Sequence, residues 1–222
     1  MYVTKFTEIQ DIGPGIKQEN PPIYGDPEAF HCSVDFTPIG RSGTESYHSK
    51  WVNGIVVYQF HRSFNRPGDR ETVMKAMQAI EGKQACVSFK ERSTEEFFVI
   101  ITRDCDPKVR RCQNVGADAK IGAPHAYDRD SFLTVYQSLN PLNKAHVGLM
   151  VHELLHVLGM VHTQTRKDRD QYIEVYDRNI ARGYWFNYMK CDDCEAHGIP
   201  YDCMSIMHYR QRIFFIALLI YV

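Results

Sequence analysis

The chain has 222 residues, of which 44% are apolar, 24% charged and 12% aromatic; this composition indicates a folded domain and excludes disordered, collagen-like and coiled-coil proteins. Its 26 basic and 27 acidic residues give a net charge of -1, which provides no general attraction for nucleic acid or an anionic membrane, so we expect neither as a partner. The longest apolar run, residues 213–222, is shorter than the roughly twenty residues that cross a bilayer, so we also expect no membrane span.

The first fifty residues are rich in glycine and proline and end in a Ser/Gly-rich stretch over residues 41–46, which predicts turns and an exposed linker. Regular structure is expected from Trp51 onward. Segments rich in Val, Ile, Phe and Tyr predict four strands, over residues 54–60, 86–90, 97–102 and 132–137. A helix is predicted over residues 66–81, ended by Gly82. The alternation predicts an α+β fold with a mixed sheet.

A second helix should begin at Asn140-Pro141, where Asn can cap the helix and Pro suits its first position, and should end at Gly159. It contains His152 and His156, which lie on one helical face because they are four residues apart, so both imidazoles can bind one metal ion. Gly159 lets the chain turn sharply, so that His162 can return as a third ligand.

Three histidine ligands leave one coordination position of a zinc ion open for water. Glu153 lies beside His152, close enough to take the proton of that water and to deliver it later to a leaving amine. The pattern therefore predicts one Zn²⁺ per chain and hydrolytic chemistry. The alternatives are histidines on an amphipathic helix without a metal, and a purely structural zinc, which the open position disfavours.

The extended motif His152-Glu153-x-x-His156-x-x-Gly159-x-x-His162 is the metzincin signature, and the flanking sequence resembles the astacin family. The segments that carry the resemblance are Trp51 to Gly54, Cys86 to Phe89, Arg166 to Tyr172, Asn179-Ile180, Tyr201-Asp202 and Ser205 to Tyr209. The resemblance extends over residues 51–209. It implies a metzincin-like protease of two subdomains, with a twisted mixed sheet and the active-site helix in the upper one and a mostly irregular lower one.

The same resemblance implies a secreted zinc endopeptidase that is made as a zymogen and hydrolyses peptide bonds of protein or peptide substrates. It makes Met207 an apolar floor beneath the metal rather than a ligand. It also makes Tyr209 an additional zinc ligand at rest, which swings away to stabilise the tetrahedral intermediate. A phenol hydroxyl is a suitable hydrogen-bond donor to a developing oxyanion.

The leading segment Ile23-Tyr24-Gly25-Asp26 resembles the propeptide motif in which an aspartate occupies the open zinc position, although Ile23 replaces a phenylalanine. Asp26 is thus expected to be a metal ligand in the zymogen only, with a plain Gly-Asp turn as the alternative. Cleavage after Arg41 by a trypsin-like protease would free Ser42. This divides the chain into an inhibitory propeptide (1–41) and a peptidase domain (42–222), with the upper subdomain over 42–159 and a truncated lower one over 160–222.

Several positions depart from the family. Thr163 replaces a glutamate that anchors the new N-terminus, and a neutral hydroxyl cannot pair with an ammonium group as a carboxylate does. Lys144 replaces the usual disulfide partner of Cys112, and the sequence after Tyr209 does not resemble the family continuation. These departures leave open a second hypothesis, in which the chain is a truncated, non-catalytic product that binds zinc or a protein partner.

The seven cysteines allow more than one arrangement, because spacing alone does not determine connectivity. Cys105 could pair with Cys112. Cys191 and Cys194, together with Cys203, could form a replacement disulfide, or with His197 they could form a small second zinc site. The usual partner of Cys86 in the family would lie beyond Val222.

Overall fold

The computed structural model describes residues 51–66, 68–83, 86–104, 116–124, 126, 131–136, 139, 142–192, 194, 196 and 199–209. The predictions for the propeptide, including Asp26 and Arg41, lie outside the described residues. So do those for a Cys105–Cys112 disulfide and for the apolar segment 213–222.

The sheet has five strands in the order β2-β1-β3-β5-β4. The strands are β1 (Ile55–Phe60), β2 (Ser88–Glu91), β3 (Val99–Thr102), β4 (Ala117–Ala119) and β5 (Phe132–Val135). β2, β1, β3 and β5 are parallel neighbours, and β4 pairs antiparallel with β5 at the edge. The mixed sheet and the four expected strands are confirmed, each shorter than predicted. The sequence did not predict β4, because its Ala-Asp-Ala segment lacks β-branched and aromatic residues.

Helix α1 (Asp69–Glu81) connects β1 to its parallel neighbour β2. It begins three residues later than predicted, because Gly68 has a left-handed φ of 86°, which a continuous helix cannot contain. Asp69 and Glu71 are acidic residues in its first turn, where their negative charge interacts favourably with the positive end of the helix dipole. Val73 and Ile80 are fully buried and place one face of α1 in the core.

Helix α2 (Val147–Val157) begins seven residues after the predicted start at Asn140. Leu142 and Asn143 are not helical. The buried Leu142 donates its backbone N–H to the Asp69 carboxylate over 3.0 Å, which holds this stretch against α1. Asn143 then caps a 3-10 turn, η6 (Lys144–His146), by accepting the Ala145 N–H over 2.9 Å. Tertiary hydrogen bonds therefore delay the helix that the local sequence would start earlier.

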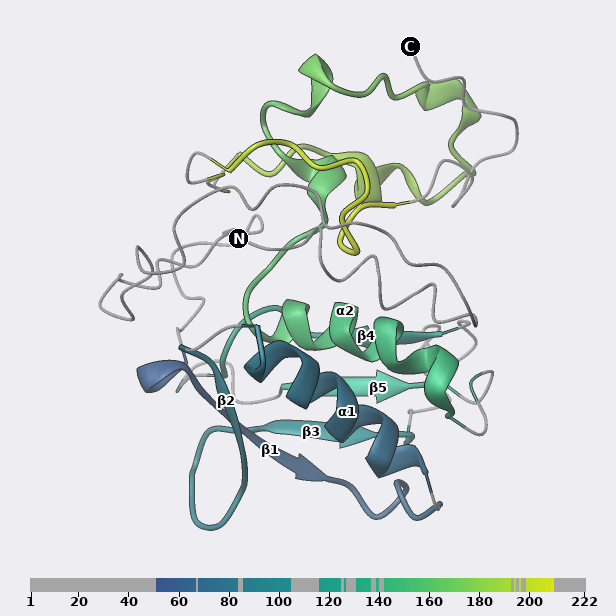
Figure 1. The fold of residues 1–222 in the computed structure, drawn as a ribbon. Helices are drawn as coiled ribbons and strands as arrows, with labels where there is room; N and C mark the ends of the chain where they lie inside the picture. Colours follow the sequence, from purple (N-terminus) through teal and green to yellow (C-terminus); the bar gives the residue numbers. More distant parts are fainter. Residues whose placement is uncertain are drawn as a thin grey trace, which may run out of the picture.

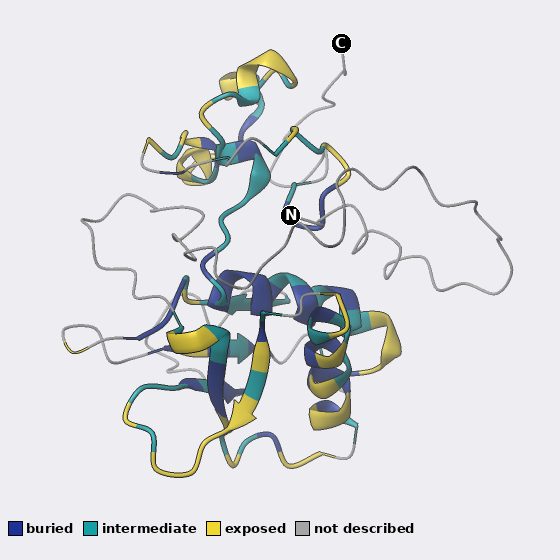
Figure 2. Ribbon diagram, turned by 60° about the vertical axis from the view of Figure 1, so that its left-hand side comes forward, coloured by how far each residue is buried: buried dark blue, intermediate teal, exposed yellow. Residues whose placement is uncertain are grey.

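The two helices pack side by side against the sheet (Figure 1), and their contact faces are buried together with the sheet (Figure 2). A buried ion pair joins the start of α1 to the end of β3: Arg103 Nε donates to Asp69 Oδ2 over 2.7 Å. The Arg103 guanidinium also donates to the carbonyls of Tyr136 and Leu139, at 3.5 and 3.1 Å. These contacts connect β3, α1 and the segment that leads into α2.

Beyond Gly159 the chain lies on the far side of α2 from most of the sheet (Figure 1), and its described residues contain neither an α-helix nor a strand. Their regular elements are the 3-10 turns η7 (Thr163–Thr165), η8 (Arg169–Gln171), η9 (Asp177–Asn179) and η10 (Trp185–Tyr188). Arginines satisfy many backbone carbonyls here: Arg166 donates to Ile199 and Pro200, and Arg169 donates to Gln164 and Tyr188. The irregular character predicted for this part is confirmed.

Cys191 and Cys194 form a disulfide, whereas Cys203 is free and exposed. The pairing of the first two corrects the idea that they act with Cys203 as ligands of a second zinc ion, because their sulfurs are bonded to each other. Cys86 is also disulfide-bonded. Within the part of the chain that the structure describes, no helix is long and apolar enough to cross a membrane.

Candidate metal centre

Three histidine side chains converge at the end of α2. His152 and His156 project from one face of the helix, one turn apart, and His162 approaches from the segment that follows. The Nε2 atom of His162 lies 3.2 Å from that of His152 and 3.3 Å from that of His156. Among the described residues these three form the one group of His, Cys, Asp and Glu side chains arranged to hold a metal ion. The predicted convergence is confirmed.

Gly159 makes the turn that returns His162 to the helix. Its φ of 99° lies in the left-handed region, which glycine adopts without the strain that a side chain would add. The Gly159 N–H donates to the His156 carbonyl over 2.8 Å, and the Met160 N–H donates to the Leu155 carbonyl over 2.9 Å. This pair of bonds is the Schellman motif, which ends a helix and reverses the chain direction.

Backbone carbonyls orient two of the imidazoles. His152 Nδ1 lies 2.8 Å from the Ile206 carbonyl oxygen, and His156 Nδ1 lies 2.6 Å from that of Met160. A carbonyl can only accept, so each Nδ1 carries the proton and each Nε2 presents a free lone pair toward the centre. Such an outer contact fixes both the tautomer and the direction of a metal-binding histidine.

The donor set fits zinc. Zinc–nitrogen bonds of about 2.0–2.1 Å in a tetrahedral arrangement separate the ligand nitrogens by about 3.3 Å, close to the two separations observed. Burial lowers the pKa of all three imidazoles, to about 3 for His156, where His152 adds to the effect. The three rings therefore stay neutral at neutral pH, and each keeps one unprotonated nitrogen, as metal ligation requires.

Glu153 is buried beside His152 on α2. Burial, and then the negative charge of Asp118 on β4, raise the pKa of its carboxyl group to about 8. A hydrogen bond from the Ala119 backbone N–H acts in the opposite direction and favours the carboxylate. A cation at the neighbouring imidazoles would also favour the ionised form, so this carboxyl group is placed to gain and lose a proton near neutral pH.

The turn around Met207 supports the histidines from below. Met207 is buried in the core, as predicted for an apolar floor. Its carbonyl accepts the Thr163 N–H over 2.8 Å, and its own N–H donates to Ser205 Oγ over 3.0 Å. The neighbouring carbonyl of Ile206 is the one that orients His152. The turn therefore contributes through its backbone as well as through the methionine side chain.

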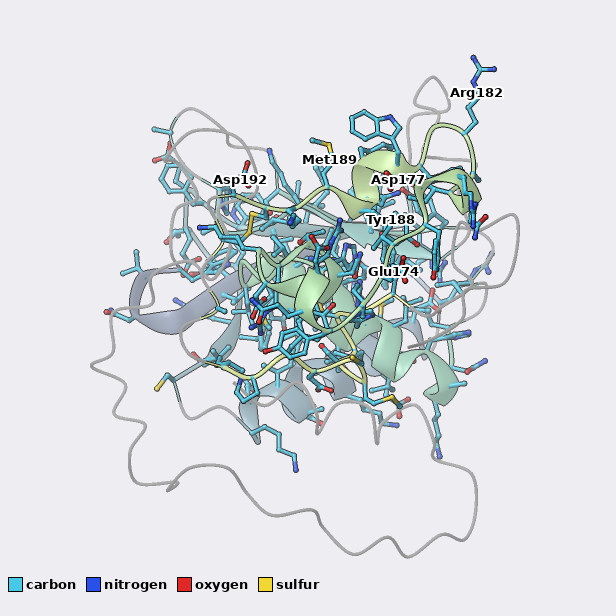
Figure 3. The ribbon with its side chains drawn as sticks, turned by 90° about the horizontal axis from the view of Figure 1, so that it is seen from above. Glu174, Asp177, Arg182, Tyr188, Met189 and Asp192 are labelled. Atoms are coloured by element: carbon cyan, nitrogen blue, oxygen red, sulfur yellow. A yellow bond between two sulfur atoms is a disulfide. The ribbon has the colours of Figure 1, made fainter. Side chains whose placement is uncertain are left out.

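The Tyr209 ring lies beside the third histidine, with 4.3 Å between the ring centroids of Tyr209 and His162. The ring of Tyr188 is a second neighbour of Tyr209, with 5.8 Å between the ring centroids. Figure 3 shows Tyr188 within the C-terminal segment, while Arg182 extends outward. Burial, and then the Glu153 charge, raise the pKa of Tyr209 to about 12. Its hydroxyl is therefore protonated at neutral pH and can act as a hydrogen-bond donor.

Several residues around the centre were not given a supporting role from the sequence: Trp51, Asp118, Ala119, Gln164, Tyr201 and Ser205. Trp51 donates its indole N–H to the Val157 carbonyl at the end of α2, over 2.8 Å. Gln164 accepts the Tyr209 N–H over 3.1 Å. These two contacts join residues 106 and 45 positions apart, so no local pattern indicates them.

Comparison with known proteins agrees with this geometry. The family model described as Astacin, a peptidase family, matches residues 43–217. The chain belongs to the astacin family. Astacins are zinc-dependent metalloendopeptidases, and the family and fold class predicted from the sequence are confirmed.

Individual astacin relatives support the assignment. The chain is 30% identical over 209 residues to tolloid-like protein 1 of Mus musculus, covering 93% of the chain and 19% of that protein. It is 32% identical over 166 residues to low choriolytic enzyme of Oryzias latipes, covering 74% of the chain and 54% of the relative. The solved structure of high choriolytic enzyme 1, a hatching enzyme zinc-protease of Oryzias latipes, matches with a TM-score of 0.62 and 28% identity, covering 80% of this chain and 82% of that one. The chain thus spans about a fifth of tolloid-like protein 1.

Proposed function

We propose that this astacin chain is a zinc-dependent endopeptidase that hydrolyses peptide bonds of protein substrates. The observation that supports it most strongly is the convergence of three unprotonated imidazole nitrogens within 4.8 Å of one another, beside a buried glutamate. Closed structural zinc sites use four protein ligands, whereas a three-histidine site leaves a position open for water or substrate.

His152, His156 and His162 would hold one zinc ion. When bound there, zinc polarises the scissile carbonyl and lowers the pKa of water enough for attack at neutral pH. Glu153 takes the proton from the attacking water and delivers it to the leaving amine, which its raised pKa suits. The Tyr209 hydroxyl serves as the additional ligand at rest and donates a hydrogen bond to the oxyanion during turnover.

The substrate is expected to bind as an extended strand along β4, one of the two edge strands of the sheet. β4 lies against α2 and supplies the Ala119 N–H that contacts Glu153, so a peptide on this edge passes close to the catalytic carboxyl group. A peptide that adds to a sheet edge is held mainly through main-chain hydrogen bonds, so this mode of binding suits substrates of varied sequence.

We further propose that the protein is secreted as a zymogen. Asp26 would occupy the open coordination position, and a trypsin-like protease would cleave near Arg41 to release the peptidase domain. The support is the resemblance of residues 23–26 to the propeptide motif. A carboxylate oxygen is a suitable zinc ligand, so this inhibition is chemically reasonable.

The decisive test is Glu153→Gln, which keeps the size of the side chain but cannot shuttle a proton. We expect the trypsin-treated variant to retain one zinc per chain, measured by atomic absorption. Its cleavage of a denatured protein substrate should fall by about 10²-fold or more. Glu71→Gln, an exposed glutamate on α1, is the matched control and should keep full activity. Undiminished cleavage by Glu153→Gln would contradict the proposal.

A second candidate, a non-catalytic chain that binds zinc or a protein partner, is favoured by one observation. Residue 163 is a threonine where the family has a carboxylate, and its hydroxyl donates a hydrogen bond to Ser205 Oγ over 3.1 Å. It therefore offers no negative charge to anchor a new N-terminus. A folded, zinc-loaded chain that stays inert after trypsin treatment would support this candidate. Cleavage that a chelator abolishes would exclude it.

A further inference from the structure

The backbone of Tyr209 is held on both sides of its α-carbon. Its N–H donates to Oε1 of Gln164 over 3.1 Å. Gln164 is only 1% exposed and is itself fixed, because its Nε2 donates to the Asn187 carbonyl over 3.3 Å. The Tyr209 carbonyl accepts from Nδ1 of His208 over 2.7 Å.

The second of these bonds determines the tautomer of His208. The carbonyl of Tyr209 can only accept, so His208 Nδ1 carries the proton and, in the neutral ring, Nε2 is an acceptor. The Tyr201 hydroxyl lies 2.8 Å from this Nε2 and is therefore its donor. Tyr201 thus fixes the orientation of the ring that holds the Tyr209 carbonyl.

Tyr201 has little freedom of its own. Its ring stacks on Tyr172, with 4.7 Å between centroids and 7° between planes. The Arg166 guanidinium also contacts the Tyr201 ring, 5.3 Å from the ring centroid. Two hydrogen bonds to the Asp168 carboxylate, of 2.9 and 2.7 Å, hold this guanidinium in place. Arg166 also donates to the Ile199 carbonyl over 3.0 Å, close to Tyr201 in the chain. These contacts restrict the Tyr201 ring and so fix the position of its hydroxyl.

We propose that Tyr201 is a positioning residue which, through His208, fixes the main chain of Tyr209. The Tyr209 phenol then changes position only by rotation of its side chain about a fixed α-carbon. A catalytic hydrogen-bond donor has to be held to within about 0.5 Å, and a backbone clamp on both sides of the residue provides this. The inference rests on the proposed roles of Tyr209 in the proposed function.

The test is Tyr201→Phe in the trypsin-treated chain, because it removes the hydroxyl and keeps the ring stack. We expect kcat to fall about tenfold, as for the loss of one hydrogen bond in a catalytic network, with KM within about twofold. Tyr172→Phe is the matched control: it belongs to the same stack, but its side chain is 49% exposed. It should leave kcat unchanged.

A spectroscopic measurement separates positioning from general stability. With Cu²⁺ in place of zinc, a coordinated Tyr209 phenolate gives a phenolate-to-copper charge-transfer band. We expect this band in the unaltered chain and in Tyr172→Phe, and expect it to be weakened or shifted in Tyr201→Phe. Tyr209→Phe should lack it.

The outcomes distinguish a failure of the proposed function from a failure of this inference. No band in the unaltered chain would show that Tyr209 is not a ligand, and would overturn the proposed role together with this inference. A normal band in the unaltered chain, with both kcat and the band unaltered in Tyr201→Phe, would overturn this inference alone. An equal loss in Tyr172→Phe would show that the effect is not specific to the Tyr201 hydroxyl and would also overturn it.

His208→Asn is a second variant that tests the same link, in case Tyr201→Phe melts at a much lower temperature than the unaltered chain. Asn can still donate to the Tyr209 carbonyl but has no atom at the position of Nε2. We expect its kcat to match that of Tyr201→Phe, and the double variant to be no slower than either single one. Additive losses would show that the two residues act separately, which contradicts the proposal.

Discussion

Thr163 contacts the turn beneath the metal centre through both its backbone and its side chain. Its N–H donates to the Met207 carbonyl, and its hydroxyl donates to Ser205 Oγ. Ser205 is buried, and its Oγ also accepts the Met207 N–H. A neutral network therefore replaces the carboxylate that the resemblance places at residue 163.

Two substitutions should separate the contributions of this network. Thr163→Val removes one hydroxyl contact and should lower the free energy of unfolding by about 0.5–1.5 kcal/mol. Ser205→Ala also leaves the buried Met207 N–H without its acceptor, so it should cost more, about 1–3 kcal/mol. Urea unfolding of the zinc-loaded chain measures both. An equal or smaller effect of Ser205→Ala would show that Met207 N–H finds another partner.

The convergence of the three histidines could be predicted because its geometry is local. His152 and His156 are joined by one helical turn, and Gly159 explains the return of His162. The supporting residues could not be predicted, since their contacts connect distant parts of the chain. Ser205 is 42 residues from Thr163, and the bonding partner of Tyr201 is known only once the fold is formed.

The last carbonyls of α2 are satisfied partly by a distant side chain. The Schellman bonds satisfy the carbonyls of Leu155 and His156, and the Trp51 indole satisfies that of Val157. Trp51 is held by a 3-10 turn, η3 (Val52–Gly54), in which a side chain at Gly54 would collide with the Cys86 carbonyl oxygen, 1.9 Å from an added Cβ. The start of the described chain is thereby attached to the end of α2.

Trp51→Phe should weaken the attachment of this helix end. It leaves the Val157 carbonyl without its donor and reduces packing against the core, so the free energy of unfolding should fall by about 1–3 kcal/mol. Zinc affinity should fall as well, because the turn that delivers His162 follows directly.

The chain contains two tryptophans, so Trp185→Phe is the natural control for this substitution. Trp185 is 61% exposed in η10, and its replacement should change stability by no more than about 0.5 kcal/mol. In that background Trp51 is the remaining tryptophan, and its fluorescence during a zinc titration reports on the helix end. Identical zinc affinities for Trp51→Phe and Trp185→Phe would contradict the coupling.

At the level of elements, long periodic segments were predicted well and boundaries were not. The spacing of Val73, Met77 and Ile80 on one helical face made α1 recognisable in the sequence, and all three are buried. The start of α2 was wrong because Asn140-Pro141 has suitable local chemistry, whereas Leu142 bonds to Asp69 on another helix. β4 is defined by its pairing with β5 rather than by its own composition.

The described molecule consists of two parts that are stabilised by different interactions. The sheet and the two helices share a continuous core that contains fully buried Val56, Ile101 and Leu133. The described part after Gly159 has short 3-10 turns and arginine-to-carbonyl contacts, and Figure 2 shows much of its surface as exposed. A small buried core and isolated turns give low local stability. The part after Gly159 is therefore expected to depend on its attachment to α2.

Zinc would strengthen that attachment, because two ligands belong to α2 and His162 belongs to the following segment. A ligand at 1,000 times its Kd stabilises the state that binds it by about 4 kcal/mol. Removal of zinc with a chelator should therefore increase amide hydrogen exchange in η8, η9 and η10, while β1 and β3 keep their protection. Hydrogen exchange with mass spectrometry measures this directly, with the same chelator presaturated with zinc as the control. An equal loss of protection in the sheet would show that the metal stabilises the core as a whole, and the two parts would then unfold as one cooperative unit.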